Sequence, residues 1–144
     1  MNESGPIKSF ALWIDSEGAD ATPWEMFLNG QLGLFARFNP LHSLGLMHLS
    51  GHLQRIRREK CGDDCLYLFL IGVDPNEQRK GLGRKLIEPV LAYTQHKGKK
   101  VVLEVQKPDN EAYYKRFGFK VVAEIKISSD GLISKTLVWS PEVR

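Results

Sequence analysis

The chain has 144 residues, of which 42% are hydrophobic and 26% are charged, and its formal net charge is +3. This length suits one domain around one core, here residues 1–144, and the composition is ordinary for a soluble globular protein. A net charge of this size is too small to indicate nucleic-acid binding on its own. Residues 1–5 are polar and lack the apolar core of a signal peptide, and the apolar run at residues 66–73 is far shorter than a membrane span. We therefore expect a cytoplasmic protein with no nucleic-acid or membrane partner.

The first half of the chain predicts one strand followed by two helices. Phe10, Leu12 and Ile14 alternate along residues 7–14, which is typical of a strand. Thr22 is a candidate N-cap, with Pro23 at the first helical position, for a helix that ends before Pro40. A second helix is expected over residues 41–60. Its apolar side chains fall on one stripe: Leu46, Leu49, Leu53 and Ile56.

The second half of the chain alternates strands and helices. Both faces of residues 66–73 are apolar, which predicts a fully buried strand. A helix over residues 81–96 ends at Gly98, and a strand follows over residues 100–105. Asp109 or Asn110 is expected to cap a short helix that ends at Gly118. Residues 119–127 and 132–139 then form a hairpin. Together these elements predict an α/β layered fold with a mixed, partly parallel sheet flanked by helices.

The cysteines and histidines have a spacing that could suggest zinc. Cys61 and Cys65 are four residues apart, and so are His48 and His52, but no paired spacing joins the two sets. We therefore interpret them as reduced thiols and surface histidines, and we expect no metal. His42 lies near the apolar stripe of its helix and is interpreted as a structural histidine, with a role as a base as the alternative.

The most informative segment is the basic glycine-rich turn that follows the apolar strand. Gly81 and Gly83 lack side chains, so a phosphate group can approach the backbone there, and the N-terminus of the next helix adds unpaired N–H donors and a positive dipole end. Four cations surround the turn: Arg79, Lys80, Arg84 and Lys85. This arrangement predicts a site for a phosphorylated ligand.

Two common phosphate-binding loops do not fit this turn. A P-loop requires a Ser or Thr after its lysine to hold magnesium, and a dinucleotide fingerprint requires three glycines. The remaining pattern is Gln78-x-x-Gly81-x-Gly83 after a strand that ends in Val-Asp-Pro. It resembles the acetyl-CoA motif of the GNAT acetyltransferases, in which the turn wraps the cofactor pyrophosphate.

A second segment extends the resemblance. Residues 110–119, with Asn110, Tyr114 and Gly118-Phe119, are similar to the second GNAT signature. The similarity runs from about residue 7 to residue 139. Within the family, the chain most resembles the branch of small-molecule N-acetyltransferases that includes puromycin acetyltransferase-like proteins. Arg79 stands where this branch commonly has glycine, which adds charge beside the pyrophosphate. Cys65-Leu66 replaces an aromatic pair often seen before the strand.

The resemblance implies a set of cofactor-binding residues for acetyl-CoA as a cosubstrate. Backbone N–H groups near residues 71–73 are expected to bind the oxyanion, because the family has a bulge at this strand end. Asn110 is expected to contact the cofactor or to cap its helix. The implied set is Ile71, Val73, Gln78, Arg79, Lys80, Gly81, Leu82, Gly83, Arg84, Asn110 and Tyr114.

Tyr114 is the candidate acid. By the resemblance, the tyrosine at this position protonates the sulfur of CoA. The alternative is a packed tyrosine whose hydroxyl is hydrogen-bonded. Tyr113 lies on a different helical face and is the weaker candidate.

Glu104 is the candidate base. Strand alternation places it with Val102 and Gln106 on the face opposite Leu103, and a carboxylate in so apolar a strand is costly without a partner or a task. A structural ion pair and an anchor for the substrate amine remain the alternatives.

These patterns favour an acetyl-CoA-dependent N-acetyltransferase that acts on a small-molecule amine by direct attack on the thioester. The alternatives are a protein or peptide amine acetyltransferase, and a CoA-binding module without turnover. The resemblance also implies that elements usual before residues 7–14 are missing. Because the apolar face of that strand would then be poorly covered, we expect a homodimer. The alternative is that the helices between residues 22 and 60 cover the sheet within one chain.

Overall fold

The computed structural model describes residues 6–15, 40–62, 64–127 and 131–142, and between residues 40 and 62 it describes side chains from residue 51 onward. The helix predicted between residues 22 and 39, the side chains of His42 and His48, and the hairpin residues 128–130 lie outside this part of the chain.

The described elements follow the predicted order. They are β1 (Ser9–Asp15), α3 (Pro40–Cys61), β2 (Cys65–Val73), the 3-10 helix η1 (Pro75–Glu77), α4 (Leu82–Lys97), β3 (Lys100–Val105), α5 (Pro108–Lys115), β4 (Lys120–Lys126) and β5 (Ile133–Trp139). Every strand, α3 and α4 begin and end within two residues of the positions that hydrophobic periodicity predicts.

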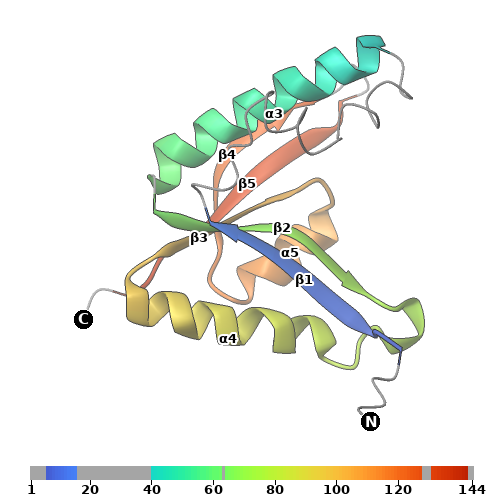
Figure 1. Cartoon of the computed structure of the whole chain (residues 1–144), viewed down its shortest axis with the longest axis vertical. Coiled ribbons are helices and arrows are strands. Elements are labelled where there is room, and N and C mark those ends of the chain that lie inside the picture. The colour runs from blue at the N-terminus through green and yellow to red at the C-terminus, as the bar shows by residue number, and fades with distance from the viewer. Residues whose placement is uncertain (1–5, 16–39, 63, 128–130, 143–144) are drawn as a thin grey trace, which may run out of the picture.

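The strands form one five-stranded sheet in the order β1-β2-β3-β5-β4 (Figure 1). Strands β2 and β3 are parallel, since α4 carries the chain back across the sheet, and the other neighbouring pairs are antiparallel. The predicted mixed, partly parallel sheet is therefore confirmed.

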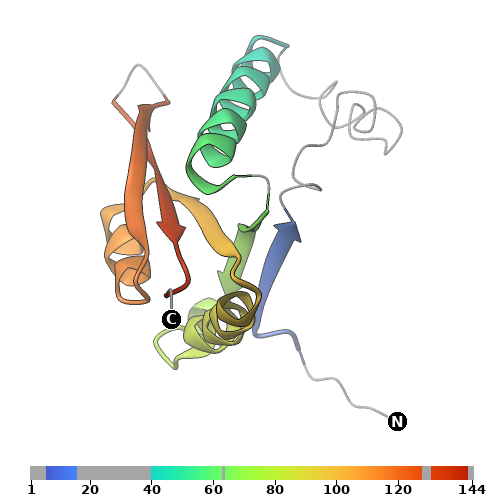
Figure 2. The ribbon, with the colours of Figure 1, turned by 90° about the vertical axis from the view of Figure 1, so that its left-hand side faces the viewer.

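Helices lie on both faces of this sheet (Figures 1 and 2). Ile87 and Leu91 of α4 and Tyr114 of α5 pack with Leu103 and other buried residues in the larger core cluster. On the opposite face, a smaller cluster at the end of α3 contains Cys61, Cys65, Val102 and Val138. The alternation along β3 thus sends Val102 and Leu103 to different cores, as the sequence predicts.

Two glycines set the limits of α4. Gly81 precedes the helix with a φ of 80°, and Gly98 follows it with a φ of 68°. Both angles lie in the left-handed region that favours glycine. Gly98 therefore ends the helix as predicted.

The cap predicted for α5 is wrong. The residue before the helix is Lys107, which makes no side-chain cap hydrogen bond, and Asp109 and Asn110 both lie inside the first turn. The helix begins at Pro108, whose fixed φ suits the first helical position and which has no N–H to satisfy.

The prediction that β2 is fully buried is also wrong. Phe69 is 55% exposed and Leu70 is 49% exposed. The register between β1 and β2 shifts here, with Leu12 opposite Leu70 and Trp13 opposite Leu68, so Phe69 is an extra residue in β2. In addition, β2 pairs with β3 only as far as Tyr67, and on that side the later residues of β2 have no neighbouring strand among the described residues.

Cys61 and Cys65 are free, buried thiols. A hydrogen bond with Cys65 and burial raise the pKa of Cys61 well above its usual range. His52 is exposed. Within the described residues, no group of three or more His, Cys, Asp or Glu side chains could hold a metal ion. The helices of this part of the chain also include none that is long and apolar enough to cross a membrane.

Candidate active site

The candidate site begins where two parallel strands part. Strands β2 and β3 pair at three positions, and the last of these joins Tyr67 to Val102. Beyond that point the strands diverge (Figure 2). Strand β2 continues to Val73 with β1 on one side and no described strand on the other. Backbone groups on this open edge of β2 can therefore bind a ligand.

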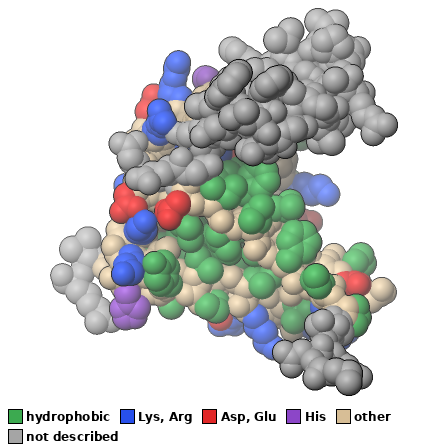
Figure 3. All heavy atoms as spheres, viewed as in Figure 1, with side chains coloured by type: hydrophobic (Ala, Val, Ile, Leu, Met, Phe, Trp, Pro, Cys, Tyr) green, Lys and Arg blue, Asp and Glu red, His purple; other side chains and the backbone are tan. Residues whose placement is uncertain are grey.

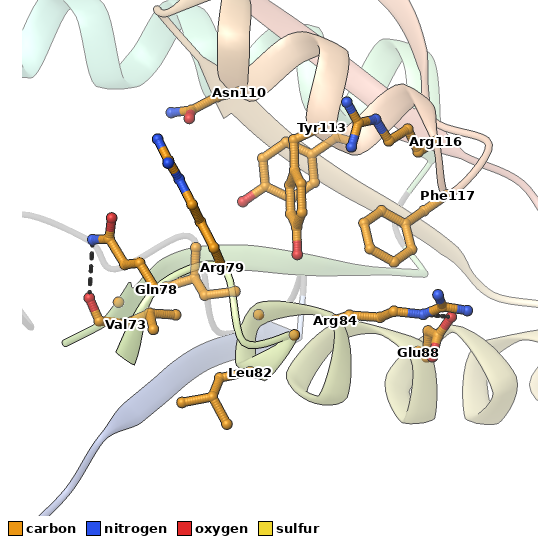
Figure 4. Close-up of a pocket in the computed structure, with 15 residues that line it drawn as sticks. Val73, Gln78, Arg79, Leu82, Arg84, Glu88, Asn110, Tyr113, Arg116 and Phe117 are labelled. Carbon is orange, nitrogen blue, oxygen red and sulfur yellow. Dashed lines mark hydrogen bonds and ion pairs between the residues drawn. The ribbon is translucent and has the colours of Figure 1, made fainter. Parts of the chain in front are cut away.

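A pocket of about 690 Å³ lies at the end of β2 (Figure 4). It is bounded by the end of β2, the glycine turn with the first turns of α4, and α5. The lining residues are Ile71, Gly72, Val73, Gln78, Arg79, Gly81, Leu82, Gly83, Arg84, Glu88, Asn110, Tyr113, Tyr114, Arg116 and Phe117.

The glycine turn presents its backbone to this pocket. Gly81 caps α4 without a side-chain hydrogen bond, so the first N–H groups of the helix receive no side-chain cap from it. At Gly83, an added Cβ would lie 2.7 Å from the hydroxyl of Tyr113, so this hydroxyl already lies close to the turn. Figure 4 shows Tyr113 pointing from α5 toward the start of α4. Gly81, Leu82 and Gly83 all line the pocket, as an anion site at the turn requires.

Two side chains hold the turn in shape. The Gln78 side-chain amide donates to the carbonyl of Val73 at 3.3 Å, which closes the turn onto the strand end. The Asp74 carboxylate accepts from the backbone N–H of Asn76 at 2.8 Å. Asp74 therefore stabilises the turn that follows the strand.

The cations around the turn differ in how they are paired. Lys80 lies 2.9 Å from Glu77, and Arg84 lies 2.6 Å from Glu88. Arg79 has no acidic partner among the described residues, and its side chain points across the pocket toward Asn110 (Figure 4). Its φ is 63°, a left-handed value that is costly for an arginine. This angle explains why glycine suits the position, and the unpaired guanidinium is suited to a phosphate.

Tyr114 lines the pocket and is almost fully buried. It is 7% exposed and packs edge-on against Tyr113 at 5.3 Å and Phe119 at 5.8 Å between ring centroids. Burial, followed by the neighbouring Tyr113, raises the pKa of Tyr114 to about 12. Its hydroxyl therefore stays protonated at neutral pH and can donate a proton or a hydrogen bond.

The structure brings the cofactor residues implied by the sequence together around the pocket, except Lys80, and it places Glu104 elsewhere. Glu104 lies on the α3 face of the sheet with a side chain that is 6% exposed, 3.5 Å from Nη1 of Arg57. Burial raises its pKa, and a hydrogen bond from Tyr67 and the charge of Arg57 act in the opposite direction. A base with a raised pKa is better matched to proton transfer near neutral pH.

Sequence reasoning missed several lining residues. Tyr113, Arg116 and Phe117 are spaced three and four positions apart on α5 and the turn after it, so one helical face presents them all. That spacing was readable in the sequence. Glu88 carried no such signal, because only the fold brings it to the pocket.

The fold and the site together define a class. The molecule is a mixed α/β protein that has a basic glycine turn beside the point where two parallel strands part. Residues 8–119 also match the model of the acetyltransferase (GNAT) family. The chain therefore belongs to the GNAT acetyltransferase family and is an acyltransferase.

Relatives agree with this assignment. The chain is 36% identical to the "5-NmdU N-acetyltransferase" of Pseudomonas phage PaMx11 over 98 residues, which are 63% of this chain and 68% of that protein. It is 37% identical to an uncharacterised N-acetyltransferase of Schizosaccharomyces pombe over 68 residues, which are 47% of this chain and only 28% of that protein. A polyamine N-acetyltransferase of Drosophila melanogaster has the same fold, with a TM-score of 0.61 and 17% identity over 96% of this chain and 71% of that one.

Proposed function

We propose that the chain transfers an acetyl group from acetyl-CoA to a small-molecule amine by direct attack of the amine on the thioester. The observation that carries this proposal is the glycine turn at the start of α4, which opens into the pocket beside the unpaired Arg79. The pyrophosphate of the cosubstrate would bind the N–H groups of this turn, and backbone groups of residues 71–73 would bind the carbonyl oxygen.

In this proposal Tyr114 donates a proton to the leaving thiolate, and Glu104 removes a proton from the acceptor amine. Burial keeps the Tyr114 phenol protonated, so it can donate a proton. Burial also raises the pKa of the Glu104 carboxyl, which makes its carboxylate a stronger base. No metal takes part in the proposed mechanism. Membership of the puromycin acetyltransferase-like branch remains a prediction.

Two further elements complete the proposal. The free, buried thiols of Cys61 and Cys65 support a reducing compartment such as the cytoplasm. A homodimer is supported by the apolar surface of β1 and β2, where Phe10 is 48% exposed and Leu12 is 47% exposed. Figure 3 shows hydrophobic side chains gathered over this region of the molecule. Strand β1 is also an edge of the sheet.

Calorimetric titration with CoA tests the cofactor site. Gly81→Glu would bring a carboxylate against the pyrophosphate, and we expect at least about tenfold weaker binding, on the order of 1.4 kcal/mol. Gly131→Glu is the matched control, since both glycines have a φ near 80–90° and no atom near an added Cβ. Equal affinity in the two folded variants would remove the turn from the site.

Release of free thiol from acetyl-CoA tests turnover and the acceptor class. The acceptor panel contains 5-NmdU, because the phage relative is named for it, together with aminonucleosides, agmatine and peptides with free N-termini. Thiol release with small amines supports the proposal. Release with peptides alone favours a protein acetyltransferase, and CoA binding without release with any amine favours a binding module.

A further inference from the structure

A buried polar cluster lies on the sheet face that α3 covers. Arg57 of α3 and Glu104 of β3 are 3.5 Å apart, with side chains that are 13% and 6% exposed. The guanidinium carbon of Arg57 lies 4.2 Å from the centre of the Tyr67 ring of β2. The Tyr67 hydroxyl donates a hydrogen bond to Glu104. Two side chains, from α3 and β2, therefore converge on the carboxylate of Glu104 in β3.

The cluster stands at the point where β2 and β3 part. Tyr67 and Val102 are the last residues that the two strands pair. Glu104 is the next residue of β3 on the same face as Val102, so it is the first side chain there beyond the paired segment. The pocket lies along β2 beyond the same point, at residues 71–73. Glu104 thus approaches the parting strands from the α3 side.

This cluster is costly to bury. Taking an arginine and a glutamate out of water costs several kcal/mol per ion before their attraction is counted. The contact of 3.5 Å is long for a hydrogen bond, so Arg57 acts on Glu104 mainly through its charge. Such a pair is weak evidence for stability, because well-packed apolar residues often serve as well.

We propose that Arg57 and Tyr67 are positioning residues that keep the Glu104 carboxylate ionised and held at the parting strands, where it takes the proton of the acceptor ammonium. This inference rests on the proposed function. In the step, one N–H bond of the ammonium breaks and its proton moves to Glu104. The amine then forms the N–C bond, the C–S bond breaks, and Tyr114 gives a proton to the thiolate. After the N–C bond has formed, the nitrogen loses its second proton, and this proton restores the Tyr114 phenol. The proton on Glu104 passes to water.

Among the described residues, few charged or titratable groups lie close to Glu104. Arg57 and Cys61 face it from α3, and Tyr67 faces it from β2. From β5 its direct neighbour is Thr136, which does not titrate. Tyr67 and Arg57 are the groups among these that favour the charged carboxylate, so removal of either should change the ionisation of Glu104.

An NMR titration tests the positioning role without any substrate. The side-chain carboxyl carbons of glutamate are labelled with ¹³C, and Glu104→Gln identifies the Glu104 signal. We expect Arg57→Gln and Tyr67→Phe to move the titration of Glu104 to higher pH, because each removes a group that favours the charged carboxylate. Arg55→Gln is the matched control, since Arg55 is an exposed arginine of the same helix. An unchanged Glu104 titration in a folded Arg57→Gln variant overturns the proposal.

The pH dependence of kcat/KM, measured with 5-NmdU and agmatine as acceptors, tests its use in catalysis. At the acidic pH values where Glu104 becomes protonated, Arg57→Gln should lower kcat/KM by about tenfold or more. At high pH, where Glu104 is ionised in both proteins, the kcat/KM of the variant should approach that of the wild type. Arg57→Lys keeps the charge and should restore kcat/KM at acidic pH. An equal loss at every pH would show a merely structural arginine and overturn the proposal. A wild-type chain that releases no thiol with any amine overturns the proposed function itself, whatever the NMR titration shows, and the catalytic role of Arg57 with it.

Discussion

The two adjacent tyrosines of α5 occupy different places around the pocket. The Tyr113 hydroxyl lies against the glycine turn at Gly83, whereas Tyr114 is buried against Phe119 in the main core. Both phenols are shifted to higher pKa by burial. The position of each hydroxyl therefore distinguishes the roles of the two tyrosines better than the pKa does. The Tyr113 hydroxyl lies close enough to the turn to contact a ligand there, whereas Tyr114 belongs to the main core.

Tyr114→Phe should slow acetyl transfer far more than it weakens CoA binding. General acid catalysis is typically worth about 10²–10⁴-fold, and phenylalanine keeps the packing of the ring. Steady-state rates of thiol release, compared with calorimetric CoA affinity, measure the two effects separately. Tyr113→Phe is the matched control and should affect CoA affinity more than the rate of transfer. Wild-type turnover in Tyr114→Phe would mean that water or another group protonates the thiolate.

Arg79 combines a strained backbone with an unpaired charge. Replacing it with glycine relieves the left-handed φ of 63° but removes the cation that points across the pocket. Because the strain costs roughly 1–2 kcal/mol and glycine gives back part of it through chain entropy, Arg79→Gly should raise the free energy of unfolding by up to about 1 kcal/mol while weakening CoA binding.

Thermal unfolding and calorimetry of the same variants check both effects. Arg79→Ala keeps the strain and loses the charge, so it should weaken CoA binding equally without the gain in stability. A CoA affinity that is unaffected in both variants would remove Arg79 from the phosphate site.

At the scale of elements, the sequence predicts what depends on local periodicity. The apolar stripe of α3 and the alternation in β3 give their limits closely, and Gly98 marks the end of α4. The gathering of the glycine turn and α5 around one pocket was accessible only through the family resemblance, because the two segments are far apart in sequence.

The features that the sequence does not predict arise from contacts between segments far apart in the chain. The exposure of Phe69 follows from the bulge in β2 and from the departure of β3, and neither leaves a trace in the composition of residues 66–73. The partner of Glu104 is 47 residues away on a helix, so the cost of a lone carboxylate predicts that a partner exists but not that it is Arg57.

The contact between α3 and β3 predicts coupling between Arg57 and Glu104. Each single change, Arg57→Met or Glu104→Gln, removes one member of a nearly buried pair and should be destabilising. The double variant should be more stable than the sum of the single effects predicts, by about 0.5–3 kcal/mol. Denaturant unfolding of the four proteins completes the cycle. Additive effects would show that the two side chains do not interact in solution.

At the scale of the whole molecule, β1 and β2 carry an exposed apolar surface. Phe10 and Leu12 of the edge strand and Phe69 and Leu70 of its neighbour are each about half exposed. The ring of Phe10 also lies over Gly72, where an added Cβ would be 2.6 Å from the ring. This contact shows that the ring packs against the backbone of β2. An apolar surface at a sheet edge favours pairing with another chain.

Light scattering across a dilution series measures the result. We expect a mass near twice 16.3 kDa at micromolar concentration. Leu12→Lys should shift the protein toward the monomer, because it places a charge in the apolar surface. Tyr93→Lys is the matched control, since Tyr93 is 56% exposed on α4, a helix packed in the core of the opposite sheet face. A wild-type chain that stays monomeric throughout the series would contradict the dimer. Phe10 and Leu12 would then not form a contact between two chains. They would lie on β1, next to β2, whose end lines the pocket.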